Sequence, residues 1–158
     1  MTDPLAKGAC KCGRVQFEAT GEPLFRAYCH CTICQSFNDA DLADILVTRS
    51  RDVLVEGREN IAFKTHQNPP LLKRGRCSDC GGVAIEEMTI PLLPRLTIIP
   101  LQTISQAAQL PPSSFHMFYH RRTADVEDTL PKHSSYISSQ VRFSTSLLKS
   151  LLAHGKTP

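Results

Sequence analysis

The sequence contains no tryptophan, and aromatic residues make up only 6% of its 158 residues. Aromatic side chains placed among basic ones, the usual platform for stacking nucleic-acid bases, are therefore scarce. The formal net charge is only +3, so the overall charge does not favour binding to nucleic acid either. These two shortages argue against a nucleic-acid partner.

Long apolar runs are also missing. The segment Ile90-Pro91-Leu92-Leu93 is interrupted by proline, and no apolar run approaches the roughly 20 residues that span a bilayer. The first residues, Met1 to Lys7, lack the basic start and apolar stretch of a secretory signal. We therefore expect no membrane span and a location in the reducing cytoplasm.

The length and composition are those of one globular domain. A chain of 158 residues can bury a core, and 41% hydrophobic with 21% charged residues is ordinary globular composition. No repeat is visible. We expect a zinc-binding domain over residues 1–140 and a helical extension, residues 141–158, packed on the same domain.

Short alternating and β-branched segments, separated by proline and glycine, predict a mainly β fold. The first clear example is Arg14 to Ala19, in which Val15, Phe17 and Ala19 share one face. The strands are expected within residues 14–19, 24–28, 42–48, 52–56, 61–64, 71–76, 83–88, 96–101 and 115–120. We expect 42–48 and 52–56 to form a hairpin or meander.

The C-terminus follows a helical pattern instead. Its apolar stripe consists of Phe143, Leu147, Leu148, Leu151 and Leu152. Ser144 or Thr145 is expected to cap the start of the helix, and Gly155 its end. We expect the helix to dock on the sheet; an exposed helix that binds a protein partner is the alternative.

Seven cysteines in a reducing compartment indicate metal binding or catalysis rather than disulfides. In an extended strand Cys10 and Cys12 point to the same face, about 6.6 Å apart between Cα atoms, so both can bind one ion. Cys77 and Cys80, followed by Gly81, have the spacing of a zinc knuckle. Together these four thiolates predict a closed structural zinc site, which ties the first strand to the middle of the chain.

The remaining cysteines, Cys29, Cys31 and Cys34, form a compact C-x-C-x2-C cluster. Three protein ligands with an open fourth position are typical of a catalytic zinc. Three thiolates give such a site a local charge of about −1, so it is a poor generator of hydroxide and suits a soft ligand such as a substrate thiolate.

Other interpretations of this cluster stay open. His30 can be a ligand, although in an extended Cys-His-Cys segment it points away from its neighbours, which favours a supporting or core position. Both zinc sites can be closed, with His30 or another residue completing the second. Catalytic or redox cysteines without metal are the third alternative.

These motifs resemble those of the glutathione-dependent formaldehyde-activating enzyme family over roughly residues 5 to 135. The matching residues are Gly8-x-Cys10-x-Cys12-Gly13-x-Val15-x-Phe17, Pro23, Cys29-His30-Cys31-x2-Cys34-Gln35, Arg76-Cys77-x2-Cys80-Gly81, His116 to Arg122 and Leu130-Pro131. The resemblance implies an Mss4-like fold of zinc-stapled sheets of short antiparallel strands, with two zinc ions per chain in the two cysteine clusters. Asp39 stands where members of the family usually carry glycine, and a family Pro-Trp is missing after Arg122.

The resemblance also implies a function, the condensation of formaldehyde with glutathione to S-hydroxymethylglutathione by a carbon-sulfur lyase. A small-molecule thiol would then be the substrate, and Cys29, Cys31 and Cys34 the catalytic zinc ligands. Arg76, Arg121 and Arg122 are candidates for the substrate carboxylates and His116 for a proton shuttle, against the alternatives of solvated charges and a core histidine. The alternative function is a non-catalytic Mss4-like zinc module that binds a protein partner.

Overall fold

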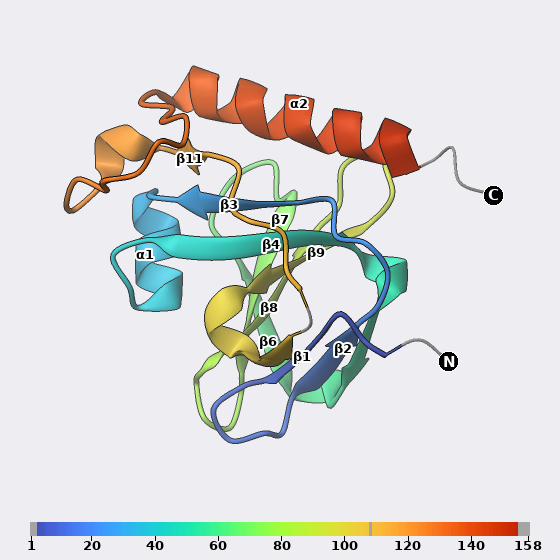
Figure 1. The fold of residues 1–158 in the computed structure, drawn as a ribbon. Helices are drawn as coiled ribbons and strands as arrows, with labels where there is room; N and C mark the ends of the chain where they lie inside the picture. Colours follow the sequence, from blue (N-terminus) through green and yellow to red (C-terminus); the bar gives the residue numbers. More distant parts are fainter. Residues whose placement is uncertain (1–2, 108, 155–158) are drawn as a thin grey trace. The chain divides into compact units, whose positions relative to one another are not determined.

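In the part of the chain that the computed structural model describes, residues 3–107 and 109–154, regular structure is mostly short β-strands with two α-helices (Figure 1). The predicted mainly β fold with a C-terminal helix is confirmed. The chain divides into two compact units. Unit 1 comprises Met1–Pro23 and Leu46–Leu110, and unit 2 comprises Leu24–Ile45 and Pro111–Pro158.

Unit 1 contains a four-stranded antiparallel sheet with the order β10-β1-β2-β5. Its strands are β1 (Ala6–Ala9), β2 (Gln16–Ala19), β5 (Val53–Glu56) and β10 (Ile104–Ala107). Phe17 and Ala19 of β2 are buried on one face, as the alternation predicted. The sequence pattern missed β1 and β10, which are only four residues long each.

The other strands of unit 1 pair in the order β9-β8-β7-β6, all antiparallel. They are β6 (Ile61–Thr65), β7 (Leu72–Cys77), β8 (Val83–Met88) and β9 (Leu96–Pro100). Strand β4 (Ala43–Arg49), most of which belongs to unit 1, lies next to β9, whereas β5 pairs with β2. The expected hairpin or meander of residues 42–48 and 52–56 is therefore wrong, because the 3-10 turn Ser50–Asp52 separates strands that belong to different sheets.

The core of unit 1 is aliphatic around one aromatic ring. Its buried members are Ala6, Phe17, Ala19, Leu46, Ile85 and Ile99. Gly8 lets β1 approach this core, since a Cβ at that position would lie 2.3 Å from the Phe17 ring and from the Thr103 carbonyl oxygen. Glycine at this position of the cysteine motif is therefore a packing requirement.

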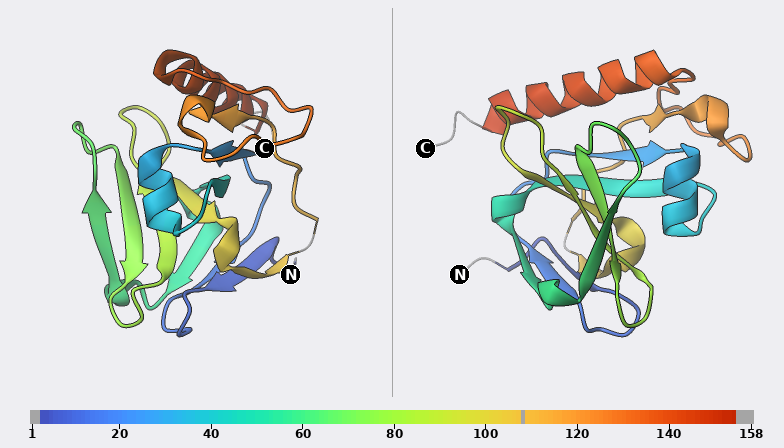
Figure 2. Two further views of the ribbon diagram at one scale, coloured as in Figure 1. Left: turned by 90° about the vertical axis from the view of Figure 1, so that its left-hand side faces the viewer. Right: turned by 180° about the vertical axis from the view of Figure 1, so that it is seen from behind.

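Unit 2 combines two strands with both α-helices (Figure 2). They are β3 (Phe25–Cys29), α1 (Thr32–Asn38), β11 (His116–Met117) and α2 (Tyr136–His154). Strands β3 and β11 pair in parallel, with His116 opposite Tyr28, which departs from the antiparallel pattern expected throughout. This short pairing places residues from two distant parts of the sequence beside the Cys29–Cys34 segment.

Helix α2 begins at Tyr136, so the expected start at Ser144 or Thr145 is wrong. Ser135 caps it, because its Oγ accepts a hydrogen bond from the backbone N–H of Ser138 at 3.1 Å. In the first two turns, apolar Ile137 and Val141 are exposed, so these turns do not continue the buried apolar stripe from which the helix was predicted. The expected cap at Gly155 lies outside the described residues, and the extension over residues 141–158 stays a prediction.

One face of α2 packs within unit 2, and β3 and β11 run beneath it (Figure 1). Phe143 and Leu147 are buried, and the Phe143 ring meets Phe25 edge to face at 5.3 Å between centroids. The opposite face exposes Ile137, Val141, Leu148 and Leu152. A protein partner for this face stays a prediction. Among the described residues, neither α-helix has the length and hydropathy needed to cross a bilayer.

Candidate metal centres

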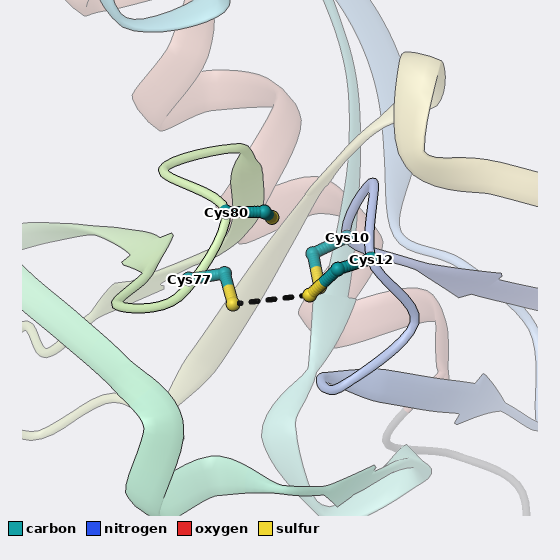
Figure 3. Close-up of side chains that lie close together, drawn as sticks. All are labelled: Cys10, Cys12, Cys77 and Cys80. Carbon is teal, nitrogen blue, oxygen red and sulfur yellow. Dashed lines mark hydrogen bonds between the residues drawn. The ribbon is translucent and has the colours of Figure 1, made fainter.

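The first cysteine cluster lies in unit 1, where two turns face each other (Figure 3). Cys10 and Cys12 come directly after β1, while Cys77 ends β7 and Cys80 sits in the turn that leads to β8. Cys10 and Cys77 are buried with Val15 and Ala84, and Cys12 is exposed. The four side chains predicted to form the structural site are therefore brought together.

The sulfur positions of this cluster fit a tetrahedral zinc ion. The Cys10 and Cys12 sulfurs are 3.6 Å apart, the Cys12 and Cys77 sulfurs are 3.7 Å apart, and all four lie within 4.8 Å of one another. With Zn–S bonds of about 2.3 Å, a regular tetrahedron has S–S edges of about 3.8 Å. The cysteines are not disulfide-bonded, so the donor set fits zinc.

Backbone hydrogen bonds shape the Cys77–Cys80 turn. The Gly81 N–H donates to the Cys77 carbonyl at 2.8 Å, and Gly81 has a φ of +69°, which glycine adopts without strain. The Arg76 side chain also supports the turn, since its Nη1 donates to the Gly81 carbonyl at 2.9 Å. The structure thus places the predicted substrate contact Arg76 beside the first cluster, in unit 1.

The thiols of this cluster differ in acidity. A hydrogen bond from the Gly82 N–H lowers the pKa of Cys80 to about 6. At Cys12 the Arg14 N–H favours the thiolate, but partial desolvation and the neighbouring thiols outweigh it and raise the pKa to about 11. Four thiolates so close together repel one another, and a divalent cation would remove that repulsion.

The second cluster lies in unit 2 at the junction of β3 and α1. Cys29 ends β3, Cys31 caps the N-terminus of α1, and Cys34 lies in its first turn, with its N–H donating to the Cys31 sulfur at 3.3 Å. The three sulfurs lie within 4.8 Å of one another. Cys29 and Cys34 are buried, whereas Cys31 is partly exposed.

This cluster has three ligand atoms rather than four among the described residues, as predicted. The Cys31 and Cys34 thiols and burial raise the pKa of Cys29 well above its ordinary value. Without a cation, three thiolates are therefore unfavourable here. Two groups in this chain thus have the donors to hold a metal ion, and they are compatible with zinc.

His30 takes the supporting position rather than that of a ligand. Its side chain is 1% exposed, and its Nε2 lies 2.8 Å from Nδ1 of His116, which is fully buried. The Nε2 of His116 lies 2.7 Å from the Asp128 carboxylate. Burial, followed by the charge of His116, lowers the pKa of His30 to about 4. Cys29 and Cys31 thus flank the first member of a buried chain of two imidazoles and one carboxylate.

Three side chains of this arrangement were missed by sequence reasoning, namely Asp128, Lys132 and Tyr119. Lys132 donates to Asp128 Oδ1 at 2.6 Å, and hydrogen bonds from Lys132 and then His116 lower the pKa of Asp128 to about 2. The Tyr119 ring packs edge-on against His30, with 5.1 Å between centroids. The one sequence signal near Asp128 is the Leu130-Pro131 motif: the Leu130 N–H donates to Asp128, and the Pro131 carbonyl accepts from the His116 N–H.

The two other predicted arginines lie in unit 2. Arg122 is already engaged, because its Nε donates to Asp125 at 2.5 Å and its guanidinium stacks 4.4 Å from the Tyr119 ring centroid. Arg121 is exposed, and its side chain has no ion-pair partner among the described residues. The Gln35 amide joins the two segments, donating to the carbonyls of both His30 and Arg121 at 2.6 and 2.9 Å.

Asp39 ends α1 in a left-handed conformation, with a φ of +49°. Its N–H closes the helix by donating to the Gln35 and Ser36 carbonyls. Glycine adopts this conformation without steric cost, while aspartate is among the few other residues that tolerate it. Aspartate is therefore compatible with the turn that ends α1, the helix that carries Cys34.

The chain is similar to known proteins in sequence and in fold. A family model described as "Glutathione-dependent formaldehyde-activating enzyme" matches residues 5–121. No curated protein matches the chain significantly. A crystal structure of a Rhodobacter sphaeroides protein shares the fold, with a TM-score of 0.51 and 22% sequence identity over 65% of this chain and 90% of that chain.

Proposed function

Because this chain belongs to the glutathione-dependent formaldehyde-activating enzyme family, we propose that it is a zinc-dependent carbon-sulfur lyase that joins glutathione, or a related thiol, to formaldehyde. The observation that carries the proposal is the division of seven cysteines into a group of four and a group of three. The group of four completes a tetrahedral zinc site, whereas the group of three leaves one position for a substrate.

In this proposal Cys29, Cys31 and Cys34 hold the second zinc ion, which supplies a soft ligand position where a substrate thiol is kept as thiolate near neutral pH. The partial exposure of Cys31 supports access from solvent. In the reaction the sulfur forms a bond to the formaldehyde carbon, the carbonyl π electron pair moves to oxygen, and the proton of the thiol ends on that oxygen. No electron is gained or lost overall, so no redox partner is needed.

Binding of the substrate carboxylates is proposed for arginine side chains. Arg121 is the best supported. The Gln35 amide donates to the backbone carbonyls of both Arg121 and His30, so Arg121 lies close to the residue between Cys29 and Cys31. Arg76 remains a proposed contact, although its hydrogen bond to Gly81 ties it to the other cluster. A guanidinium can form paired hydrogen bonds with a carboxylate, which a lysine cannot reproduce.

His116 is proposed to act on the substrate through His30 rather than by direct contact. Both of its ring nitrogens already have hydrogen-bond partners, and its side chain is fully buried. A proton shuttle through His116 would therefore pass by way of His30.

The proposal is tested by counting zinc and measuring activity in the same preparations. We expect about two zinc ions per chain, and formaldehyde-dependent loss of free glutathione faster than the spontaneous reaction. Cys31→Ser should abolish the acceleration and leave about one zinc, since it removes a ligand of the second site alone. Arg121→Lys should keep both metals and raise the glutathione KM.

Two outcomes would contradict the proposal. One is a zinc content of one, with all three cysteines of the second cluster readily alkylated in the folded protein. The other is two zinc ions but no acceleration, which would leave the non-catalytic zinc module, with a protein partner, as the better hypothesis. A cytoplasmic location, where glutathione is abundant and thiols stay reduced, is part of the proposal.

A further inference from the structure

Asp128 lies 94 residues beyond Cys34 in the sequence, yet its carboxylate ends the hydrogen-bonded chain that starts at His30. We propose that Asp128 is a positioning residue of the second metal centre, which fixes the rings of His116 and His30 and thereby holds the Cys29–Cys31 segment in place. This inference rests on one part of the proposed function, namely that the second cluster holds a metal ion.

The carboxylate of Asp128 is itself held firmly. Its Oδ1 accepts hydrogen bonds from Lys132 Nζ at 2.6 Å and from the Leu130 N–H at 3.1 Å, while Oδ2 lies 2.7 Å from His116 Nε2. Two donors thus fix one oxygen, so that the other faces the imidazole.

His116 has little freedom to turn. Its backbone is bonded on both sides, with its N–H donating to the Pro131 carbonyl at 2.8 Å and its carbonyl accepting from the His133 N–H at 2.9 Å. The Tyr28 and Tyr119 rings pack against the imidazole, with centroids 4.9 and 5.6 Å away. The ring is therefore held both by its hydrogen bonds and by its packing.

These contacts determine which nitrogens carry protons when both imidazoles are neutral. A carboxylate only accepts, so His116 Nε2 carries a hydrogen and its Nδ1 accepts. His30 Nε2 must then be the donor to His116 Nδ1, which leaves His30 Nδ1 without a hydrogen. Because the backbone N–H of His30 also donates to the Met117 carbonyl at 3.0 Å and its carbonyl accepts from Gln35, the residue between two ligands is held at three points.

Replacing Asp128 by asparagine is expected to reverse this chain. Lys132 and the Leu130 N–H require an acceptor at the Oδ1 position, so the amide oxygen stays there and the amide NH2 faces His116 Nε2. Nε2 must then accept, and the protons of both imidazoles move to Nδ1. A loss of packing alone would not invert the tautomers, so the inversion distinguishes positioning from a structural role.

The test uses the full chain with histidine side chains labelled with 15N. In the wild-type protein we expect the Nε2–H tautomer at both His30 and His116, and in Asp128→Asn the Nδ1–H tautomer at both. In chelator competition, Asp128→Asn should lower zinc affinity at the second site by about 10- to 100-fold and leave the first site unchanged. In the cobalt-substituted protein, only the absorption bands of the second site should shift, with bands assigned by comparison with Cys31→Ser.

Asp125→Asn is the matched control, because Asp125 lies in the same loop but bonds Arg122 instead of a histidine. It should change neither the tautomers nor the metal affinity. The inference is overturned if the wild-type tautomers differ from Nε2–H, or if Asp128→Asn changes zinc affinity at the second site by less than about twofold. If Asp128→Asn fails to fold, wild-type tautomers other than Nε2–H still overturn the inference.

The failure of this inference can be told from failure of the proposed function. A wild-type protein with only one zinc ion contradicts the proposed function. In that case the histidine tautomers and the alkylation rate of Cys31 in Asp128→Asn still test whether Asp128 holds the Cys29–Cys31 segment in place. Two zinc ions with unchanged second-site affinity in Asp128→Asn contradict only the positioning role.

Discussion

Cys77→Ser is expected to destabilise the protein far more than the loss of one side chain would suggest. Its sulfur lies 3.7 Å from that of Cys12, 65 residues earlier, so a zinc ion bound by both would close a long loop. By the relation used for disulfide cross-links, closing a loop of this length stabilises the folded state by about 4 kcal/mol. The whole free energy of unfolding of a domain is only about 5–15 kcal/mol.

The assay is urea unfolding followed by far-ultraviolet circular dichroism, since the chain has no tryptophan to report on folding. With an m value of about 2 kcal/mol/M, a loss of about 4 kcal/mol lowers the midpoint by about 2 M. Removing zinc from the wild-type protein with a chelator should produce a similar shift, and chelation should barely affect Cys77→Ser.

Cys34→Ser is the control, because Cys34 is also buried but its site joins residues only five apart, Cys29 to Cys34. The ratio of loop lengths, 65 to 5, corresponds to about 2 kcal/mol less stabilisation from loop closure. The reasoning would be refuted if Cys77→Ser left the urea midpoint unchanged, or if Cys34→Ser lowered it as much as Cys77→Ser did.

Three further predictions concern stability away from the first cluster. Asp39→Gly should raise the free energy of unfolding by about 0.5–1 kcal/mol in urea titrations, because glycine accepts the φ of +49° without strain; a loss of stability would contradict this explanation. Leu147 is 2% exposed, so Leu147→Ala should lower the free energy of unfolding by about 2–4 kcal/mol. The neighbouring Leu148 is 48% exposed, so Leu148→Ala should lower it by less than about 1 kcal/mol. Equal effects would show that α2 is not docked as described. The Asp128 pKa is lowered from 3.8 to about 2, so the carboxylate contributes its full stabilisation above about pH 4, and this stabilisation is lost as the pH falls towards 2. When the free energy of unfolding is measured against pH, Asp128→Asn should lack this part of the decline. The same slope in the variant and the wild-type protein would contradict a hydrogen-bonded carboxylate.

The local pairing of the cysteines could be predicted from sequence because it follows from spacing, whereas the meeting of the two pairs 65 residues apart depends on the fold. Cys10 and Cys12 lie two residues apart, and Cys77 and Cys80 three apart, so each pair presents its sulfurs together whatever the rest of the fold does. The structure brings the sulfurs of Cys10, Cys12, Cys77 and Cys80 together, and separately those of the 29–34 cluster, so that each group could hold a metal ion. The metal itself stays a prediction.

Other elements could not be predicted because their local signal is weak or because they depend on a tertiary contact. Helix α1 has only seven residues, and it begins with a cysteine cap in which sulfur accepts a backbone N–H, an unusual start. The first turns of α2 expose Ile137 and Val141, which obscured the start of the helix. The role of Asp128 depends on the parallel pairing of β11 with β3, a tertiary contact between segments almost 90 residues apart.

The two clusters also differ in when a growing chain can first bind metal. The ligands at residues 29, 31 and 34 leave the ribosome almost together, so this group can bind an ion as a short peptide. The other group is incomplete until Cys80 has been synthesised and the loop after Cys12 has closed. On a nascent chain the three thiol ligands of the site proposed for catalysis are therefore all present first, although His116 and Asp128, which support it, emerge only after Cys80. The four-cysteine group is the later one to gain its full set of ligands.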